Sequence, residues 1–154
     1  MDYEVRRAEA SDAVGISRVI IRALRETNAK DYTPDIIARV ELSFSPAAVE
    51  QLISRRTVFV GLAGDCIVGT GSLDGDVVRT MFVCPDMQAR GIGRSLLRAI
   101  EEVARDRQIA VLTVPASVSA ESFYARLGFQ AVRDAYHGME RTIIMERVLS
   151  PPAE

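Results

Sequence analysis

A glycine-rich turn lies near the middle of the chain, between a strand-like segment and a long amphipathic segment. The turn, Gln88-Ala89-Arg90-Gly91-Ile92-Gly93, follows Asp76–Val83, whose β-branched and apolar residues favour a strand. Apolar residues then recur at helical spacing from Ile92 to Ala104. Glycines let the backbone approach a ligand closely, and the N–H groups that begin a helix attract anions. This order of elements indicates a layered fold with a ligand site at the turn.

The remaining segments place helices and strands on both sides of this unit. Ser11 is expected to cap one helix and Ser45-Pro46 to begin a second, with Asp31–Pro34 as the break between them. A further helix is expected over Ala120–Leu127, ending at Gly128. The expected strands are Tyr3–Arg7, Thr57–Leu62, Cys66–Leu73, Asp76–Val83, Ile109–Val114, Phe129–Asp134 and Arg141–Leu149. We predict an α+β fold of the sandwich type, with a mixed, mostly antiparallel sheet of about seven strands and helices on both faces.

The length and composition limit the class of protein. The 154 residues fit one domain, predicted over residues 1–149, with a flexible tail over residues 150–154. Apolar residues make up 48% and charged residues 26%, and no apolar run reaches the roughly 20 residues of a membrane span. The net charge of −2 argues against a nucleic-acid partner. Cys66 and Cys84 fit no disulfide or metal spacing and no secretory signal is present, so we expect no metal and a cytoplasmic location.

The glycine-rich turn does not fit two common phosphate-binding patterns. A Walker loop would continue with Gly-Lys-Ser/Thr, which does not follow Gly93. In a dinucleotide-binding turn a third glycine would stand where this chain has Leu96. Arg90 and Arg94 can still form charge-assisted hydrogen bonds with phosphate oxygens. The turn by itself is therefore either a plain strand-to-helix connection or the site of a phosphate-containing ligand without hydride chemistry.

Two motifs resemble those of the GNAT N-acetyltransferases. The family pattern Gln/Arg-x-x-Gly-x-Gly/Ala is matched by Gln88, Gly91 and Gly93. The pattern Asn-x-x-Ala-x-x-Phe-Tyr-x-x-x-Gly-Phe is matched at Ala120, Phe123, Tyr124, Gly128 and Phe129, with Ser117 in place of the usual Asn. The resemblance covers the chain from about Thr57 onward. The N-terminal helices, where acceptor specificity in this family usually lies, match only in order and length.

The resemblance implies a GNAT-like sheet whose central parallel strand pair splays apart, with acetyl-CoA as cosubstrate between the two strands. It implies that Met81, Phe82 and Val83 line the pantetheine arm, which binds like an extra strand. It also implies that amides from Gln88 to Ser95 hold the pyrophosphate. The expected cofactor-binding residues are Met81, Phe82, Val83, Gln88, Ala89, Arg90, Gly91, Ile92, Gly93, Arg94, Ser95, Ser117, Phe123 and Tyr124.

The resemblance also implies direct attack of a neutral primary amine on the thioester. In that reaction the backbone N–H of Val83 stabilises the oxyanion, and Tyr124 is the general acid that protonates the departing thiolate. A phenol with a pKa of about 10 is protonated at neutral pH. The alternative for Tyr124 is a core tyrosine, because Ala120, Phe123 and Leu127 form an apolar stripe with it.

The general base is not identified. Removing a proton from a lysine-like amine at neutral pH costs roughly 4.6 kcal/mol, and many family members place a glutamate on the strand before the turn. Val78 stands at that position here, and Ile109–Val114 contains no carboxylate. Asp76 adjoins Gly75 in a turn and His137 is a lone loop histidine, so neither is assigned. A water chain to the bulk, or an amine of low pKa, would make a protein base unnecessary.

Other functions fit parts of the sequence. The missing carboxylate is compatible with a non-catalytic acyl-CoA-binding sensor or regulatory module, whereas Tyr124 argues for an enzyme. Cys84 follows the thioester strand, but without a partnered histidine a packed thiol is favoured over an acyl-cysteine. A modifier of charged transfer RNA would need a basic surface. We therefore expect an acetyl-CoA-dependent N-acetyltransferase that acts on a small-molecule or protein amine.

Two further hypotheses concern the surface of the protein. Asp31–Pro34 is either an aromatic lip over the acceptor site or a plain helix-breaking turn. The apolar strand Arg141–Leu149 is suited to pair or pack across a two-fold axis, which makes a homodimer a hypothesis. The sequence favours neither alternative for the first segment.

Overall fold

The computed structural model describes residues 3–26, 33–87, 91–137 and 140–149. Within these ranges the elements are β1 (Glu4–Arg7), η1 (Ala10–Asp12), α1 (Ala13–Glu26), α2 (Pro34–Leu42), α3 (Pro46–Arg55), β2 (Thr57–Ala63), β3 (Cys66–Asp74), β4 (Val77–Val83), η2 (Pro85–Met87), α4 (Ile92–Asp106), β5 (Val111–Ser117), η3 (Val118–Ala120), α5 (Glu121–Arg126), β6 (Gln130–His137) and β7 (Glu140–Val148). The expected tail, residues 150–154, lies outside the described residues. No helix in the described ranges is both long and apolar enough to cross a membrane.

The strands form one sheet in the order β1-β2-β3-β4-β5-β7-β6. Neighbouring strands are antiparallel except for β4 and β5, which are parallel and are connected through α4. The mixed, mostly antiparallel sheet and its central parallel pair are therefore confirmed.

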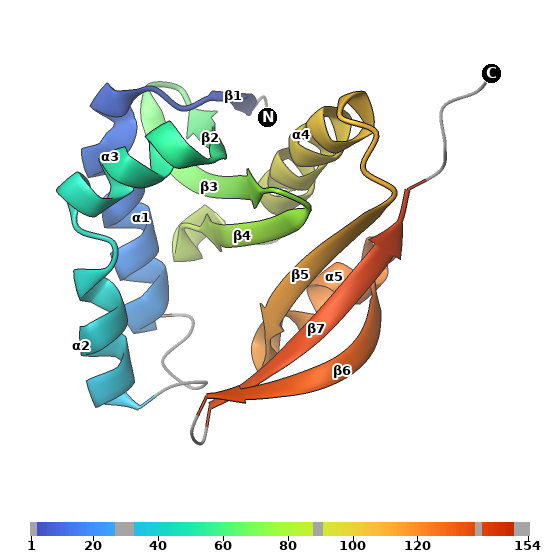
Figure 1. Cartoon of the computed structure of the whole chain (residues 1–154). Coiled ribbons are helices and arrows are strands. Elements are labelled where there is room, and N and C mark those ends of the chain that lie inside the picture. Colours follow the sequence, from blue (N-terminus) through green and yellow to red (C-terminus); the bar gives the residue numbers. More distant parts are fainter. Residues whose placement is uncertain (1–2, 27–32, 88–90, 138–139, 150–154) are drawn as a thin grey trace.

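The sheet carries an apolar cluster on each face. Successive side chains of a strand point to opposite faces, and in β2 Val58 and Val60 pack with α1 and α3 whereas Phe59 packs with α4 and α5. Figure 1 shows α1, α2 and α3 gathered on one side of the molecule, with α4 and α5 apart from them. The prediction of helices on both faces is confirmed.

Helix α2 lies where we expected a break. Thr33 caps it by accepting a hydrogen bond from the Ile36 N–H at 3.3 Å, and Pro34 occupies the first turn. Ser45 and Pro46 begin α3 in the same way. In the described ranges three α-helices therefore precede β2, and the expectation of two was wrong. Asp31 and Tyr32, the other half of the expected lip, lie outside the described residues.

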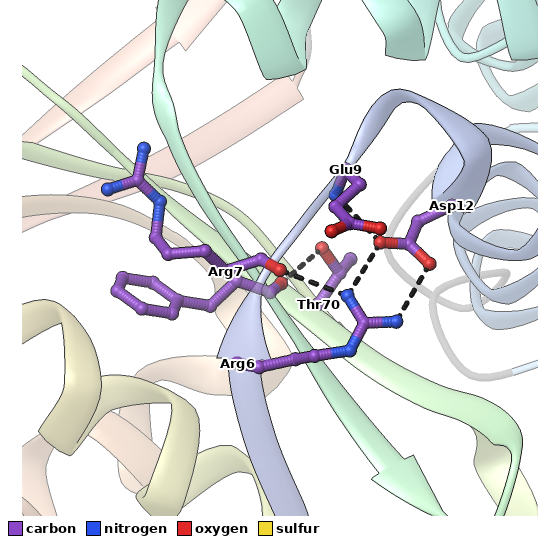
Figure 2. A network of polar contacts seen from close by, with 6 residues as sticks. Arg6, Arg7, Glu9, Asp12 and Thr70 are labelled. Carbon is purple, nitrogen blue, oxygen red and sulfur yellow. Dashed lines mark hydrogen bonds and ion pairs between the residues drawn. The ribbon is translucent and has the colours of Figure 1, made fainter.

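Ser11 does not cap α1, because it lies inside η1, a single turn of 3₁₀-helix that precedes α1. The turn is instead closed by Asp12, whose Oδ2 accepts a hydrogen bond from the Glu9 N–H at 2.7 Å. Arg6 of β1 donates to both carboxylate oxygens of Asp12, at 2.8 and 3.0 Å (Figure 2). The Arg6 guanidinium holds the pKa of Asp12 below its ordinary value. This network fixes the start of α1 against the first strand.

Strand β5 continues past Val114, the end that we expected, and includes Pro115. The Thr113 N–H donates to the Asp76 carbonyl beside β4 at 3.0 Å, so the backbone nitrogen of residue 115, two positions later, faces the same edge of the strand. Proline has no N–H and is tolerated in a strand only where no neighbour needs one. Because β4 pairs with β5 only at Val77 and Thr113, Pro115 removes no ladder bond.

Candidate active site

The parallel strands β4 and β5 touch at one point and then diverge. Their register consists of the pair Val77 and Thr113 alone, whereas β5 pairs with β7 at every residue from Val111 to Ser117. Figure 1 shows the two strands separating toward their carboxyl ends. We call the region between them beyond the Val77–Thr113 pair the split. It confirms the splayed strand pair that the resemblance implied.

A β-bulge lies halfway along β4, at the edge of the split. Thr70 pairs with Phe82 and Ser72 with Arg79, so two residues of β4, Thr80 and Met81, stand opposite Gly71 alone. Thr80 has φ 56°, in the left-handed region. A Cβ on Gly71 would lie 2.9 Å from the Met81 Cε, so the glycine makes room for the Met81 side chain. Pairing between strands creates this bulge, and no local sequence pattern predicts it.

The backbone of Val83 is directed toward the split. The next residue, Cys84, donates its N–H to the Val68 carbonyl of β3 at 2.7 Å. Because successive N–H groups of a strand point to opposite edges, the Val83 N–H is directed away from β3 and toward β5. The residue expected to stabilise an oxyanion therefore presents its amide on the side where β4 and β5 part.

Helix α4 follows the carboxyl end of β4 in the chain. Gly91 is its N-cap with φ 87°, a conformation that favours glycine. Ile92 is buried in the core, so only its backbone can face a ligand, whereas Arg94 is exposed. The Ser95 N–H donates to the Gly91 carbonyl at 3.0 Å, so this amide is already used within the helix. Gln88, Ala89 and Arg90 lie outside the described residues.

Gly93 brings three elements of the site together. A Cβ at this position would lie 3.0 Å from the Phe123 Cζ of α5 and 3.7 Å from the Val83 Cγ2 of β4. The absence of a side chain thus lets the first turn of α4 lie against both. The second glycine of the turn has a packing role in addition to any role in ligand binding.

Tyr124 lies in the core under this junction. It is 4% exposed, and its ring makes edge contacts with Phe123 (centroids 5.0 Å apart) and Phe129 (5.5 Å). Burial raises the pKa of the Tyr124 phenol, which keeps the group protonated at neutral pH. The structure therefore has the contacts of a core tyrosine together with the protonation state that a general acid requires.

The other expected coenzyme residues differ in what they can offer. Met81 packs against the cluster under α4, whereas Phe82 packs against Phe44 on the opposite face, with ring centroids 6.2 Å apart. By the alternation that directs the Val83 N–H toward β5, the Phe82 N–H faces β3, where Phe82 pairs with Thr70, so Phe82 offers no amide to a ligand in the split. Ser117 is half-buried at the end of β5, where it also precedes η3.

The positions considered for a general base supply none. Val78 is fully buried in the core, and Asp76 is exposed in the turn that precedes β4. His137 ends β6, and its side chain lies outside the description. Within the described ranges no group of three or more His, Cys, Asp and Glu residues is placed to hold a metal ion.

Cys84 is held by an arginine that the sequence did not single out. Arg22 of α1 donates to the Cys84 Sγ at 3.0 Å and to the Asp86 Oδ2 at 2.8 Å. Glu26, one helical turn later, accepts a third hydrogen bond from Arg22 at 2.7 Å. Arg22 therefore connects α1 to η2, the segment that leads from β4 toward the glycine-rich turn. Arg22 and Cys84 are 62 residues apart in the sequence, so no local pattern predicts that they meet.

The chain is similar to known proteins in sequence and in fold. A model of the acetyltransferase (GNAT) domain matches residues 28–140. The uncharacterized N-acetyltransferase YafP of Escherichia coli K12 is 25% identical over 132 residues, which cover 86% of this chain and 84% of that protein. The crystal structure of a GCN5-related N-acetyltransferase from Rhodopseudomonas palustris superposes with a TM-score of 0.90 at 23% identity, covering 97% of both chains. The PaiA N-acetyltransferase of Thermoplasma acidophilum, solved in complex with coenzyme A, has a TM-score of 0.84 at 19% identity, covering 97% of this chain and 100% of that one.

Since the domain match spans most of the chain, the protein belongs to the GNAT acetyltransferase family. It is an acetyl-CoA-dependent N-acetyltransferase by class.

Proposed function

We propose that the protein transfers the acetyl group of acetyl-CoA to a primary amine, on a small molecule or a protein, by direct attack. The observation that carries this proposal is the split. Two parallel strands that share a single register pair leave a strand edge, opposite Pro115, to which an extended ligand can add. A pantetheine arm has amides spaced to bond such an edge.

The residues around the split fit this cosubstrate. Gly91 and Gly93 open the N-terminus of α4, where backbone N–H groups favour a pyrophosphate, and Arg94 is exposed beside it. Met81 and Val83 of β4 present backbone groups to the arm, Ser117 ends β5 on the other side of the split, and the Phe123 ring lies against Gly93. Gln88, Ala89 and Arg90, which lie outside the described residues, stay part of the proposed site, and the Ile92 contribution is limited to its backbone.

The chemical roles follow from position and protonation. The Val83 N–H, directed toward the split, donates to the carbonyl oxygen as negative charge develops there. Tyr124, a phenol that is protonated at neutral pH and whose pKa burial raises further, gives its proton to the departing sulfur. A neutral amine needs no further group for the attack itself; bulk water receives the proton that the product nitrogen loses, and a proton from water restores the Tyr124 phenol.

The proposal is tested by titrating the purified protein with acetyl-CoA while following heat and the thermal midpoint, and then by measuring thiol release with a panel of amines. We expect saturable binding that raises the midpoint. The Gly91→Glu variant should lose binding, because it places a side chain at φ 87° and a negative charge at the phosphate site. Absence of binding by the wild-type protein contradicts the proposal. Binding without thiol release for any amine supports the acyl-CoA sensor instead.

A further inference from the structure

The bulge in β4 is held in a conformation that its own residue disfavours. Thr80 has φ 56°, and a β-branched residue in the left-handed region is a backbone outlier. Such a conformation persists only when surrounding contacts hold it in place. Two side chains from other elements contact the backbone or side chain of the bulge.

Ser72 of β3 is the first contact. Its hydroxyl donates to the Arg79 carbonyl, directly before Thr80, at 2.7 Å, and the residue is 2% exposed. Water therefore has little access to replace this hydrogen bond. Loss of the hydroxyl would remove a short hydrogen bond from a carbonyl beside the strained residue.

Arg56, at the carboxyl end of α3, is the second contact. Its Nη1 donates to the Thr80 Oγ1 at 3.2 Å, and its side chain is 20% exposed. The Nε of the same guanidinium lies 3.7 Å from the Asp74 carboxylate on β3. The ion pair with Asp74 thus fixes the Arg56 guanidinium, and the guanidinium in turn holds the Thr80 side chain by a hydrogen bond.

We infer that Ser72 and Arg56 are positioning residues for acetyl transfer. By holding the bulge they fix the direction of β4 after Thr80, and with it the Val83 N–H and the strand edge that meets the thioester. This inference rests on the proposed function. Neither residue touches the reacting atoms; both act through the backbone of β4.

The test is the kcat of Ser72→Ala, measured with acetyl-CoA and the best amine. Displacement of an oxyanion donor by a fraction of an ångström is expected to lower kcat about 10- to 100-fold. The matched control is Thr70→Val, since Thr70 is 1% exposed on the same strand but its hydroxyl (Figure 2) donates to the Phe59 carbonyl of β2 at 3.0 Å and not to β4. The control should lose stability but keep most of its kcat.

A suppressor separates positioning from general damage. Glycine adopts positive φ without strain, so Thr80→Gly should restore the kcat of Ser72→Ala to within a few-fold of the wild type. Arg56→Met should lower kcat in the wild-type background and have no further effect in Thr80→Gly, which lacks the Oγ1 that Arg56 holds. This second cycle decides the matter even if Ser72→Ala does not fold.

Amide chemical shifts give a readout that does not depend on turnover. The Val83 amide signal should shift in Ser72→Ala and return in the double variant Ser72→Ala/Thr80→Gly. Unchanged kcat in Ser72→Ala, a loss equal to that of Thr70→Val, or no rescue by Thr80→Gly overturns the inference. If the wild-type protein releases no thiol, the proposed function fails instead, and the amide shifts still show whether the two residues hold the bulge.

Discussion

The α-carbon of Gly93 faces the ring of Phe123, and a Cβ added at Gly93 would lie 3.0 Å from the Phe123 Cζ. The ring of Phe123 in turn lies 5.0 Å from that of Tyr124, measured between centroids. The glycine-rich turn, the end of β4 and the proposed acid are therefore linked by direct packing. A change at the turn reaches Tyr124 through one aromatic ring.

Gly93→Ala is expected to destabilise the fold by about 1 to 3 kcal/mol, because the new methyl group overpacks against Phe123. It should also lower kcat/KM, since the displaced ring contacts Tyr124. Thermal or denaturant unfolding and steady-state kinetics measure the two effects. The double variant Gly93→Ala/Phe123→Leu makes space for the methyl group and should regain stability. Equal stability of Gly93→Ala and wild type would contradict the packing role.

Tyr124→Phe is expected to lower kcat about 100-fold, a typical contribution of a general acid. The phenylalanine ring keeps the contacts with Phe123 and Phe129, so the affinity for acetyl-CoA and the thermal midpoint should change little. Kinetics and calorimetry on the same preparation separate these quantities. A variant with the kcat of the wild type would show that Tyr124 is a core residue only.

Arg22→Ala is expected to raise the KM for acetyl-CoA about 2- to 5-fold, the range of a partly exposed ion pair. The reason is the loss of the hydrogen bonds from Arg22 to Cys84 and Asp86 that hold η2. Arg25→Ala is the matched control, because Arg25 lies on the same helix but bonds Glu41 of α2 at 2.6 and 2.9 Å. If both variants raise KM equally, Arg22 has no special connection to the coenzyme site.

Asp12→Ala is expected to destabilise the protein at neutral pH by roughly 1 kcal/mol, as typical for loss of a capping side chain. Arg6 lowers the pKa of Asp12 in the folded protein, so the stability from the carboxylate is present above the unfolded pKa of about 4 and is lost as the pH falls through the lower folded value. Denaturant unfolding at pH 7 and pH 3 should therefore show a smaller difference between variant and wild type at pH 3. A difference that grows in acid would contradict this sign.

The sequence predicted the parts of the fold that local patterns determine. The strand segments β2 and β3, the helical spacing of α4 and the cap at Ser45 all depend on neighbours a few residues away. Helix α2 was also readable, because Thr33 and Pro34 repeat the signal of Ser45 and Pro46. It was missed because proline was interpreted as a break and not as a first-turn residue.

The remaining features depend on pairing between distant segments. Thr80 adopts positive φ only because β4 carries one residue more than β3 between two ladder positions, which no preference of threonine predicts. Proline is disfavoured in a central strand, and β5 accommodates Pro115 because the split leaves its nitrogen at an edge without a ladder. The proposed site gained Arg22, Arg56 and Ser72 in the same way, through contacts that the fold alone creates.

The single register pair of β4 and β5 has a mechanical consequence. The two halves of the sheet are held together by side-chain packing, since one core cluster contains Val78 and Ile100 from one half and its crossover helix, and Val114 and Ile143 from the other. A hydrogen-bonded ladder fixes register residue by residue, whereas apolar packing has no preferred direction. The angle between the halves is therefore set by the volume of the side chains beneath the split. Exchanging a large core residue there for a smaller one should change the width of the opening, and with it the bulk of the acyl group that enters, while every strand keeps its register.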